Sequence, residues 1–424
     1  MSEDYFLSKS NPIATVDQRT AEDTALSLIA RPEVQQARKQ VEGYMRAVLT
    51  NDIGDLVEGI DPFLDEYMFH YALRAVNWDA NFPKVVQFLG PPHHWFGRDV
   101  PGSRYGSDCV DFIYRTIAIG HGNSYVITGK ATCDIKPMTN YILKGGSSFP
   151  PNAMGALESL DMEFDGDGNF NITIDSTPAD GRKNHLQTRP GATQLWIRDA
   201  LVDWSNQSPN ALRVEMLSAP TRSPLTEDEM AALLVRQAVE GVYFNYYNLR
   251  LSFLVPRRNE LKSPEPSALL GGFPSQFAVG TAVSLAEDEA LIVTASHSGA
   301  TFRNAILTDP FTVSLNYWDY QTTLNSAQME PDADGRFTYV LSHQDPGTHN
   351  WLDCRGEPLV YFIQRWQAFD RSREPEVPTI SSRLVRLSDL EPNLPDGIKR
   401  VDGAGREQQL TRRQEGFARR FSDT

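Results

Sequence analysis

The spacing of hydrophobic residues predicts helices in the first part of the chain. After Pro32, apolar residues recur close to every 3.6 positions, at Val34, Ala37, Val41, Tyr44, Met45 and Val48. Residues 61–79, DPFLDEYMFHYALRAVNWD, are rich in helix formers and begin with an acid. We therefore expect residues 1–85 to form a helical N-terminal segment.

Short runs with strand composition follow the turn-rich residues 90–106. They are DFIYRTIAI, SYVITGKATCDI, ATQLWIRDALVDW and ALRVEML. The run LDMEFDGDGNFNITIDS alternates polar and apolar residues around an Asp-Gly-Asp-Gly turn, which predicts a hairpin. Together these runs predict a first β-rich domain over residues 86–225.

A single helix interrupts the strand pattern. Thr226 and Glu229 have the spacing of a capping box, and apolar residues follow at Met230, Leu233, Leu234, Ala238 and Val242. We expect a connecting helix and linker over residues 226–265.

Strand composition resumes near residue 280. The runs are TAVSLAEDEALIVTAS, ATFRNAILTD, TVSLNYWDYQTTLN, DGRFTYVLS and EPLVYFIQRWQ. No helix long enough for a βαβ unit separates them, which favours antiparallel sheets. Residues 266–387 are therefore expected to form a second domain and residues 388–424 a polar tail. The predicted class is mainly β with helical elements (α+β), with two antiparallel β-sandwich or jelly-roll domains.

The composition of the chain limits where in the cell the protein is expected and which kinds of partner it is expected to bind. No apolar run in the 424 residues approaches the ~20 that a membrane helix needs. The acidic, polar start lacks the pattern of a secretory signal, so we expect a cytoplasmic protein. A net charge of −15 disfavours nucleic acid as a partner. Assembly into a homo-oligomer stays open.

The three cysteines predict no disulfide framework and no zinc site. Cys109, Cys133 and Cys354 are odd in number and lack CxxC spacing, so buried thiols are the favoured interpretation. A nucleophilic Cys354 stays open. The adjacent His93 and His94 have no ligand-like spacing, and we expect neither a metal nor an organic cofactor.

The second β region resembles a known family. In chain order it contains ALIVTAS, LNYWDY, DGRFTYVLSHQDPGTHNWLDCRG and PLVYFIQRW, over roughly residues 280–368. These runs, and above all the DPGxxNWLD core, resemble the family catalogued as domain of unknown function twelve-fourteen. An upstream Asp-x-x-Tyr-Arg tract is similar too, at Asp111, Tyr114 and Arg115. The resemblance implies a jelly-roll fold for the C-terminal part and little about a reaction. Family members often have a Gly-His pair after NWLD, whereas this chain reads CRGEP.

The stretch HQDPGTHNWLD supports two interpretations. As a structural turn, Asp345 accepts from following amides, while Asn350 and Asp353 cap the loop and Trp351 anchors it. As a site, Asp353 is a general acid or base with His343 or His349 as its partner. Asp345 and Asp353 together also allow a glycosidase-like carboxylate pair.

These residues predict an enzyme more readily than a scaffold. The expected catalytic residues are Asp353, His349, His343 and Asp345. The expected substrate-binding residues are Asn350, Trp351, Tyr317, Trp318, Asp111, Tyr114 and Arg115. We expect a cofactor-independent hydrolase or lyase that acts by acid–base chemistry on a small hydroxylated or ring-bearing molecule. The alternative is a carbohydrate-binding or small-molecule-binding module without catalysis, since folds of this kind host unrelated functions.

Overall fold

Five α-helices and two β-sandwiches occupy the part of the chain that the computed structural model describes, which is residues 5–132, 138–144, 152–249, 257–267, 276–369 and 376–422. The α-helices are α1 (Val16–Ile29), α2 (Pro32–Ile53), α3 (Asp61–Val76), α4 (Glu227–Leu249) and α5 (Gly403–Ala418). Short 3-10 helices are η1 (Gly54–Gly59), η2 (Ser159–Asp161), η5 (Leu387–Asp389), η6 (Glu391–Asn393) and η7 (Arg419–Phe421).

The predicted helices begin where the sequence provides a cap or a proline. Helix α2 begins at Pro32, and its apolar face is buried except at Val48, which is half-buried, and Tyr44, which is 48% exposed. At α4, the Thr226 hydroxyl accepts from the Glu229 amide at 3.3 Å. The Glu229 carboxylate accepts from the Thr226 amide at 2.8 Å. The predicted capping box is therefore confirmed.

The first sandwich has a five-stranded and a four-stranded sheet. The first sheet runs in the order β1 (Val86–Leu89), β4 (Phe112–Ala118), β10 (Ala192–Ala200), β6 (Met138–Lys144) and β7 (Asn152–Glu158). The second runs β11 (Ala211–Met216), β5 (Tyr125–Lys130), β8 (Asn169–Asp175) and β9 (His185–Gln187). Buried aliphatic side chains such as Ile117, Ile127, Ile172 and Leu195 fill the core. A separate hairpin joins β2 (His93–Trp95) to β3 (Arg98–Val100).

The second sandwich repeats this plan. One sheet runs in the order β12 (Glu265–Pro266), β13 (Phe277–Val283), β19 (Val360–Phe369), β15 (Ala300–Thr308) and β16 (Thr323–Asn325). The other runs β18 (Trp351–Asp353), β17 (Phe337–Ser342), β14 (Glu289–Ala295) and β20 (Ile380–Arg386). Antiparallel pairing prevails, with parallel pairs at β8–β9 and β17–β18. The predicted class, mainly β with helices and sandwich-like sheets, is confirmed.

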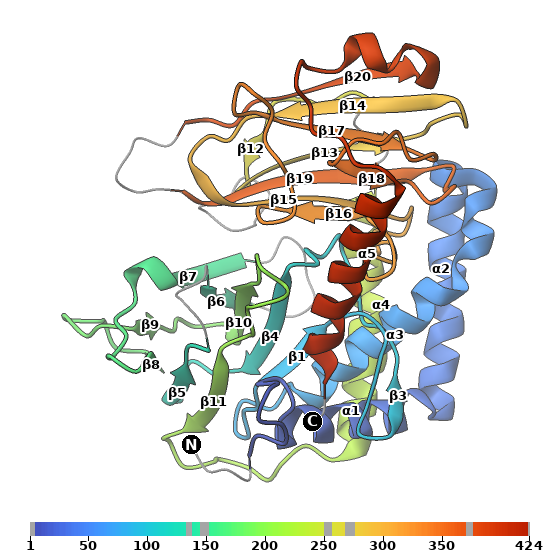
Figure 1. The fold of residues 1–424 in the computed structure, drawn as a ribbon. Coiled ribbons are helices and arrows are strands. Elements are labelled where there is room, and N and C mark those ends of the chain that lie inside the picture. The colour runs from blue at the N-terminus through green and yellow to red at the C-terminus, as the bar shows by residue number, and fades with distance from the viewer. Residues whose placement is uncertain are drawn as a thin grey trace.

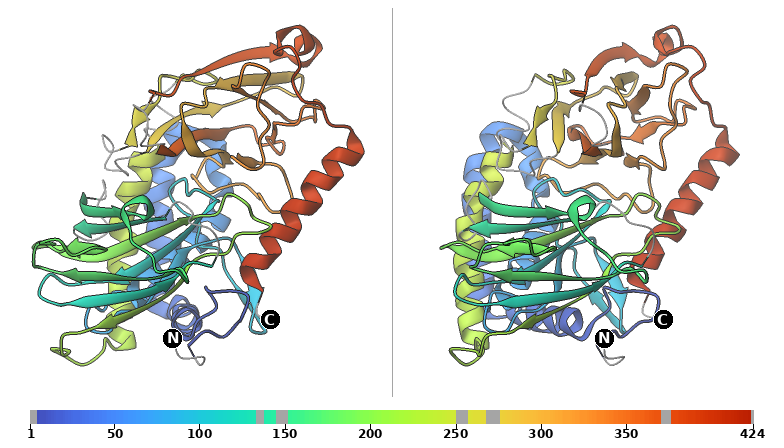
Figure 2. Two further views of the ribbon diagram at one scale, coloured as in Figure 1. Left: turned by 60° about the vertical axis from the view of Figure 1, so that its left-hand side comes forward. Right: turned by 90° about the vertical axis from the view of Figure 1, so that its left-hand side faces the viewer.

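The helices and both sandwiches share one apolar cluster. It extends from α1–α4 through Phe112 of the first sandwich to Phe302 of the second, and the centroids of these two rings lie 5.0 Å apart. Figure 1 shows the second sandwich above the first, with helices beside them. Figure 2 shows α5 on the side opposite to α2 and α4. The two sandwiches are therefore held together by helices α1–α4 on one side, by α5 on the opposite side and by the direct contact between Phe112 and Phe302.

Two of the predicted strand runs form only in part. The run TVSLNYWDYQTTLN forms a strand only at Thr323–Asn325. The Asn316 carboxamide accepts from the Asp319 amide at 3.0 Å and donates to the Asp319 carboxylate at 2.9 Å, which favours a turn over a strand. The hairpin predicted around Asp165 is also wrong. Only its second half, β8, is a strand, because the Asp165 carboxylate accepts from the amides that follow and closes a tight local turn.

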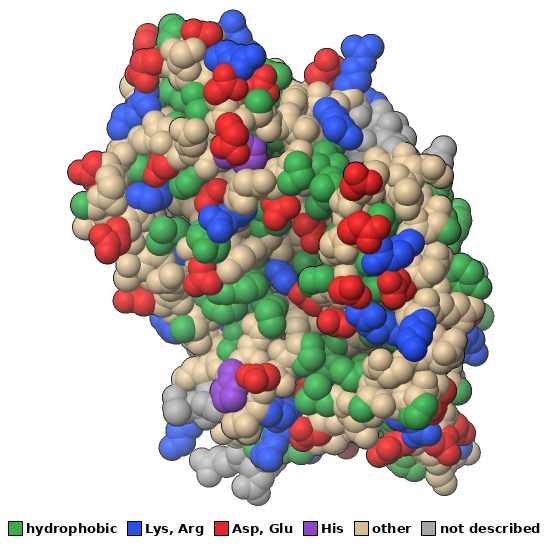
Figure 3. Space-filling model, turned by 90° about the vertical axis from the view of Figure 1, so that its right-hand side faces the viewer, with side chains coloured by type: hydrophobic (Ala, Val, Ile, Leu, Met, Phe, Trp, Pro, Cys, Tyr) green, Lys and Arg blue, Asp and Glu red, His purple; other side chains and the backbone are tan. Residues whose placement is uncertain are grey.

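Charges of both signs share the molecular surface. On the face seen in Figure 3, acidic and basic side chains are interspersed among hydrophobic ones. On this face, the net charge of −15 is not gathered into a single acidic field. Among the described residues, no helix is long and apolar enough to cross a membrane.

Close packing between α3 and α4 predicts opposite effects for two glycine substitutions. A Cβ at Gly241 would lie 1.9 Å from the Tyr71 hydroxyl oxygen, so Gly241→Ala is expected to destabilise the protein by about 1–3 kcal/mol. A Cβ at Gly43 in α2 would meet no atom within 4 Å, so Gly43→Ala is expected to stabilise it by up to ~1 kcal/mol. Urea denaturation measures both changes. Equal stabilisation by the two substitutions would contradict the close approach of α3 and α4.

Candidate functional site

The stretch HQDPGTHNWLD, residues 343–353, forms the surface on which α5 docks. The Asp345 carboxylate accepts from the Gly347 amide at 2.8 Å, and Gly347 has a φ of +71°, as the turn interpretation predicts. The same carboxylate pairs with the Arg406 guanidinium of α5, with Nε–Oδ2 and Nη2–Oδ1 distances of 2.9 and 3.1 Å. Arg406 also donates to the Thr348 carbonyl at 2.6 Å. Asp345 therefore both shapes the turn and holds α5.

The two histidines of this stretch contact different parts of the protein. The His349 ring lies 3.1 Å from the Gln328 carbonyl oxygen and from the Gln409 carboxamide nitrogen of α5. Burial lowers the pKa of His349. The His343 Nε2 lies 3.2 Å from the Leu285 carbonyl oxygen. Within the described residues, no hydrogen bond or ion pair joins either histidine to Asp353.

The remaining polar groups of the stretch have partners within the second sandwich. The Asn350 carboxamide donates to the Glu330 carbonyl at 2.7 Å and accepts from the Glu330 amide at 2.9 Å. The indole of Trp351 donates to the Ser342 hydroxyl at 3.0 Å. The Asp353 carboxylate accepts from the Arg355 amide at 2.8 Å. These contacts support the structural interpretation, and a catalytic role for the stretch stays a prediction.

The junction between the sandwiches brings together candidates from both halves of the sequence. Asp111 is fully buried and accepts from Trp204 Nε1 at 2.8 Å and Asn325 Nδ2 at 2.7 Å. The Asn304 carboxamide donates to its other oxygen. Burial raises the pKa of Asp111. Its donors come from the connection between β10 and β11 and from strands β15 and β16, so this carboxylate links the two sandwiches.

Tyr317 and Trp318 lie at the same junction, whereas Arg115 does not. The rings of Tyr317 and Trp318 pack on Phe417 of α5, at centroid distances of 5.7 and 5.2 Å. The Tyr114 hydroxyl accepts from the Cys109 amide at 3.0 Å. Arg115 instead pairs with Asp199 inside the first sandwich, with Nη2 and Oδ2 2.5 Å apart.

A small, partly open cavity lies in this junction. Asp108, Tyr114, Tyr317, Arg420 and Phe421 line it, together with residues near Gly90 and Phe112. Its volume of about 10 Å³ is enough for about one water molecule. Asp108 Oδ1 and Arg420 Nε and Nη2 are buried without a hydrogen-bond partner among the described residues. Buried polar atoms normally have partners, so these atoms mark a place for a water or a ligand.

Asp108 is a buried acid–base candidate at this cavity, which residues 343–353 do not line. It is 8% exposed, and burial raises its pKa to about 6 against the opposing charge of Arg104. Its Oδ2 lies 3.5 Å from the Ser314 hydroxyl oxygen. The sequence offered one signal for Asp108, its place three residues before Asp111. Arg420 is one of two adjacent arginines in the polar C-terminal residues, a pattern typical of solvent-exposed charges. The sequence therefore gave no sign that Arg420 is buried.

The described cysteines are buried inside the protein. Cys109 and Cys354 are buried and free, and burial raises the pKa of the Cys109 thiol to about 12. Burial also raises the pKa of Cys354. Cys133 lies outside the described residues. Among the residues described, no three His, Cys, Asp or Glu side chains gather in a way that could hold a metal ion.

Comparison with known proteins gives a fold and no activity. No family model and no curated protein matches the chain. An uncharacterised protein from Burkholderia cenocepacia has a similar structure, with a TM-score of 0.71 and 24% identity over 86% of this chain and 99% of that one. A protein from Vibrio parahaemolyticus matches with a TM-score of 0.41 and 11% identity over 76% of this chain and 99% of that one. The Burkholderia structure supports the arrangement of the fold.

The α5 docking surface predicts a specific stability loss. Arg406→Met removes the donors to Asp345 and Thr348, and we expect a loss of about 1–3 kcal/mol together with faster amide hydrogen exchange over α5. Arg412→Met removes the same charge from the exposed face of α5 and is the matched control. Equal effects of the two substitutions would contradict the docking role of Arg406.

The buried Asp108 carboxyl predicts a pH-dependent stability difference. Its folded-state pKa of about 6 exceeds the unfolded value of about 3.9, so the stability that it contributes is present below pH ~4 and lost as pH rises through ~6. The advantage of Asp108→Asn over the unmodified protein should therefore grow by about 2–3 kcal/mol between pH ~4 and ~7. Denaturation at a series of pH values measures this. Asp167→Asn, at an exposed turn, is the control, and a pH-independent difference for Asp108→Asn would contradict the raised pKa.

Proposed function

We propose that this protein is an enzyme of hydrolase or lyase type that acts by acid–base chemistry at the junction cavity. The observation that carries the proposal is that Asp108 and Arg420, which both have buried polar atoms without a partner among the described residues, line the same small cavity. Its substrate is a small hydroxylated or ring-bearing molecule. We infer that the reaction needs no organic cofactor and that the protein works in the cytoplasm, alone or as a homo-oligomer.

The two groups supply complementary chemistry. A carboxyl with a pKa of about 6 is mostly ionised at neutral pH, yet it remains basic enough to take a proton from a bound water or hydroxyl. The Arg420 guanidinium can donate from Nε and Nη2 to an oxygen that gains negative charge. Arg420 Nη1 is held by the Val110 carbonyl at 2.7 Å, which fixes the direction of the other donors.

The size of the cavity limits how a substrate enters. The cavity has room for about one water molecule, which would be the water that attacks in a hydrolase or the water that is eliminated in a lyase. The rest of the substrate does not fit in it. Phe421 forms part of the wall, and its ring lies 4.2 Å from the His93 ring, centroid to centroid. In this proposal, the Phe421 side chain turns aside to admit the substrate, while Arg420 stays held by the Val110 carbonyl. The rings of Tyr114 and Tyr317 contact the apolar part of the substrate.

Activity measurements on two carboxylate variants test the proposal. The purified protein is incubated with a panel of nitrophenyl esters, glycosides and hydroxy acids. We expect Asp108→Asn to lower turnover by roughly 100-fold or more, with a turnover that rises through pH ~6 in the unmodified protein. Asp353→Asn keeps its contact to the Arg355 amide and is expected to leave turnover unchanged.

Other outcomes of this experiment have a definite meaning. Full activity of Asp108→Asn would overturn the proposed role of the junction. Loss of activity in Asp353→Asn alone would move the site to residues 343–353. Saturable binding of a panel member without turnover, in all variants, would support the alternative of a binding module for carbohydrates or small molecules.

A further inference from the structure

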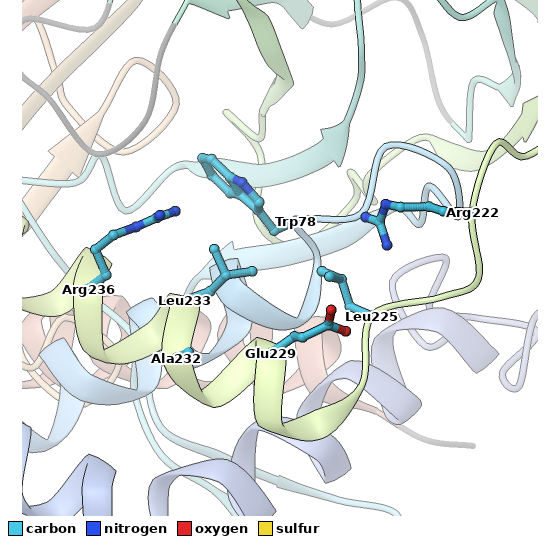
Figure 4. A pocket seen from close by; sticks show the side chains of 7 residues that line it. All are labelled: Trp78, Arg222, Leu225, Glu229, Ala232, Leu233 and Arg236. Carbon is cyan, nitrogen blue, oxygen red and sulfur yellow. The ribbon is translucent and has the colours of Figure 1, made fainter.

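A second hollow, open to solvent, lies beside the first turns of α4. It has a volume of about 330 Å³, within the range of small-molecule sites. Figure 4 shows the side chains that line it, which are Trp78, Arg222, Leu225, Glu229, Ala232, Leu233 and Arg236. We call it the α4 groove. It shares no lining residue with the junction cavity.

The floor of the α4 groove is apolar and contains one indole ring. Trp78 follows the C-terminal end of α3, and Leu233 faces it from α4 (Figure 4). The guanidinium of Arg74 lies 5.8 Å from the centroid of the Trp78 ring, a cation–π contact that helps to fix the ring. The partly exposed ring can therefore stack with a planar group in the groove.

The charged side chains at the rim differ in whether another residue already pairs with them. Arg222 pairs with the buried Asp79, with Nη2 and Oδ1 2.8 Å apart. The Glu229 carboxylate is occupied by the Thr226 amide and hydroxyl of the capping box. Exposed Arg236 has no hydrogen bond or ion pair within the described residues, and in Figure 4 its guanidinium extends toward Trp78. A cation without a protein partner beside an aromatic floor is complementary to an anion that carries a ring.

A neighbouring hollow supports Arg236 as the anchor. This hollow, of about 510 Å³, shares Arg236 and Ala232 with the α4 groove. Its other basic residue, Arg31, pairs with Glu33 and Asp228 at 2.6 and 2.5 Å. The unpaired positive charge of both hollows is therefore that of Arg236, among the described residues.

We propose that the α4 groove binds a small planar aromatic molecule that carries a carboxylate. The ring lies against Trp78 and Leu233, and the carboxylate accepts from Arg236. A guanidinium can hold both carboxylate oxygens, which gives direction to a site whose remaining contacts are apolar. The groove needs no movement of the protein to admit this ligand.

Binding of 2-naphthoate tests this proposal, with 2-naphthamide as the uncharged analogue of the same shape. Isothermal titration calorimetry of the full chain is expected to give saturable binding of the naphthoate, with the amide roughly tenfold weaker or more. Arg236→Met is expected to weaken naphthoate binding by a similar factor and to leave amide binding unchanged. Trp78→Ala should weaken both ligands.

Controls separate binding in the groove from other effects. Arg383→Met removes an exposed arginine from β20 of the second sandwich and should leave binding unchanged. If Trp78→Ala fails to fold, Trp78→Leu replaces it, since leucine keeps an apolar floor without an aromatic face. Naphthoate binding that is absent up to the solubility limit, or equal in Arg236→Met and the unmodified protein, would overturn the proposal. Equal affinities for the acid and the amide would overturn the role of the carboxylate.

Discussion

The burial of one carboxylate, that of Asp111, determines how the parts of this protein meet. A carboxylate removed from water is costly unless hydrogen-bond donors surround it. Its donors are Trp204 from the first sandwich and Asn304 and Asn325 from the second. Because each donor has to reach the same two oxygens, the sandwiches can adopt only a narrow range of relative positions. The Phe112 and Phe302 rings, whose centroids lie 5.0 Å apart, add apolar contact to this polar link.

Helix α5 connects this polar centre to the stretch HQDPGTHNWLD. Its first half is held by that stretch through Arg406, and its second half reaches the junction through Arg413 and η7. Arg413 donates to the Tyr317 and Thr323 carbonyls at 3.1 and 2.7 Å, and burial lowers its pKa to about 10. The tail therefore closes the junction and is not a loose appendage. Residues 343–353 support this closure through the contact between Asp345 and Arg406.

The two candidate sites differ in the physical reason for expecting a ligand. In the junction cavity, buried polar atoms of Asp108 and Arg420 lack partners, and a buried polar atom without a partner costs free energy. The α4 groove instead offers an open apolar hollow with the charge of Arg236 beside Trp78. The first kind of site suits chemistry away from bulk water. The second suits reversible binding from solution.

The sequence by itself determined the local features, because these depend on neighbours in the chain. The 3.6-residue period of α2, the capping box of α4 and the strand composition of both sandwiches were readable from the sequence. Where local polar side chains form turns, as at Asn316 and Asp165, strand composition was misleading. The sequence also marked Asp111, Tyr114 and Tyr317 as candidates, but not that they lie at one junction.

Only the tertiary structure decided which candidates meet and which are held apart. Asp353 and the two histidines are close in sequence, yet each contacts a different segment: His343 lies at the Leu285 carbonyl, His349 at the Gln328 carbonyl, and Asp353 at the Arg355 amide. Asp108 and Arg420 are more than 300 residues apart and line one cavity. Arg420 has the sequence context of a solvated charge, and its burial follows from the docking of α5, which no local pattern specifies. Long-range packing thus determined which residues line the junction cavity, whereas short-range periodicity determined the helices and strands to which those residues belong.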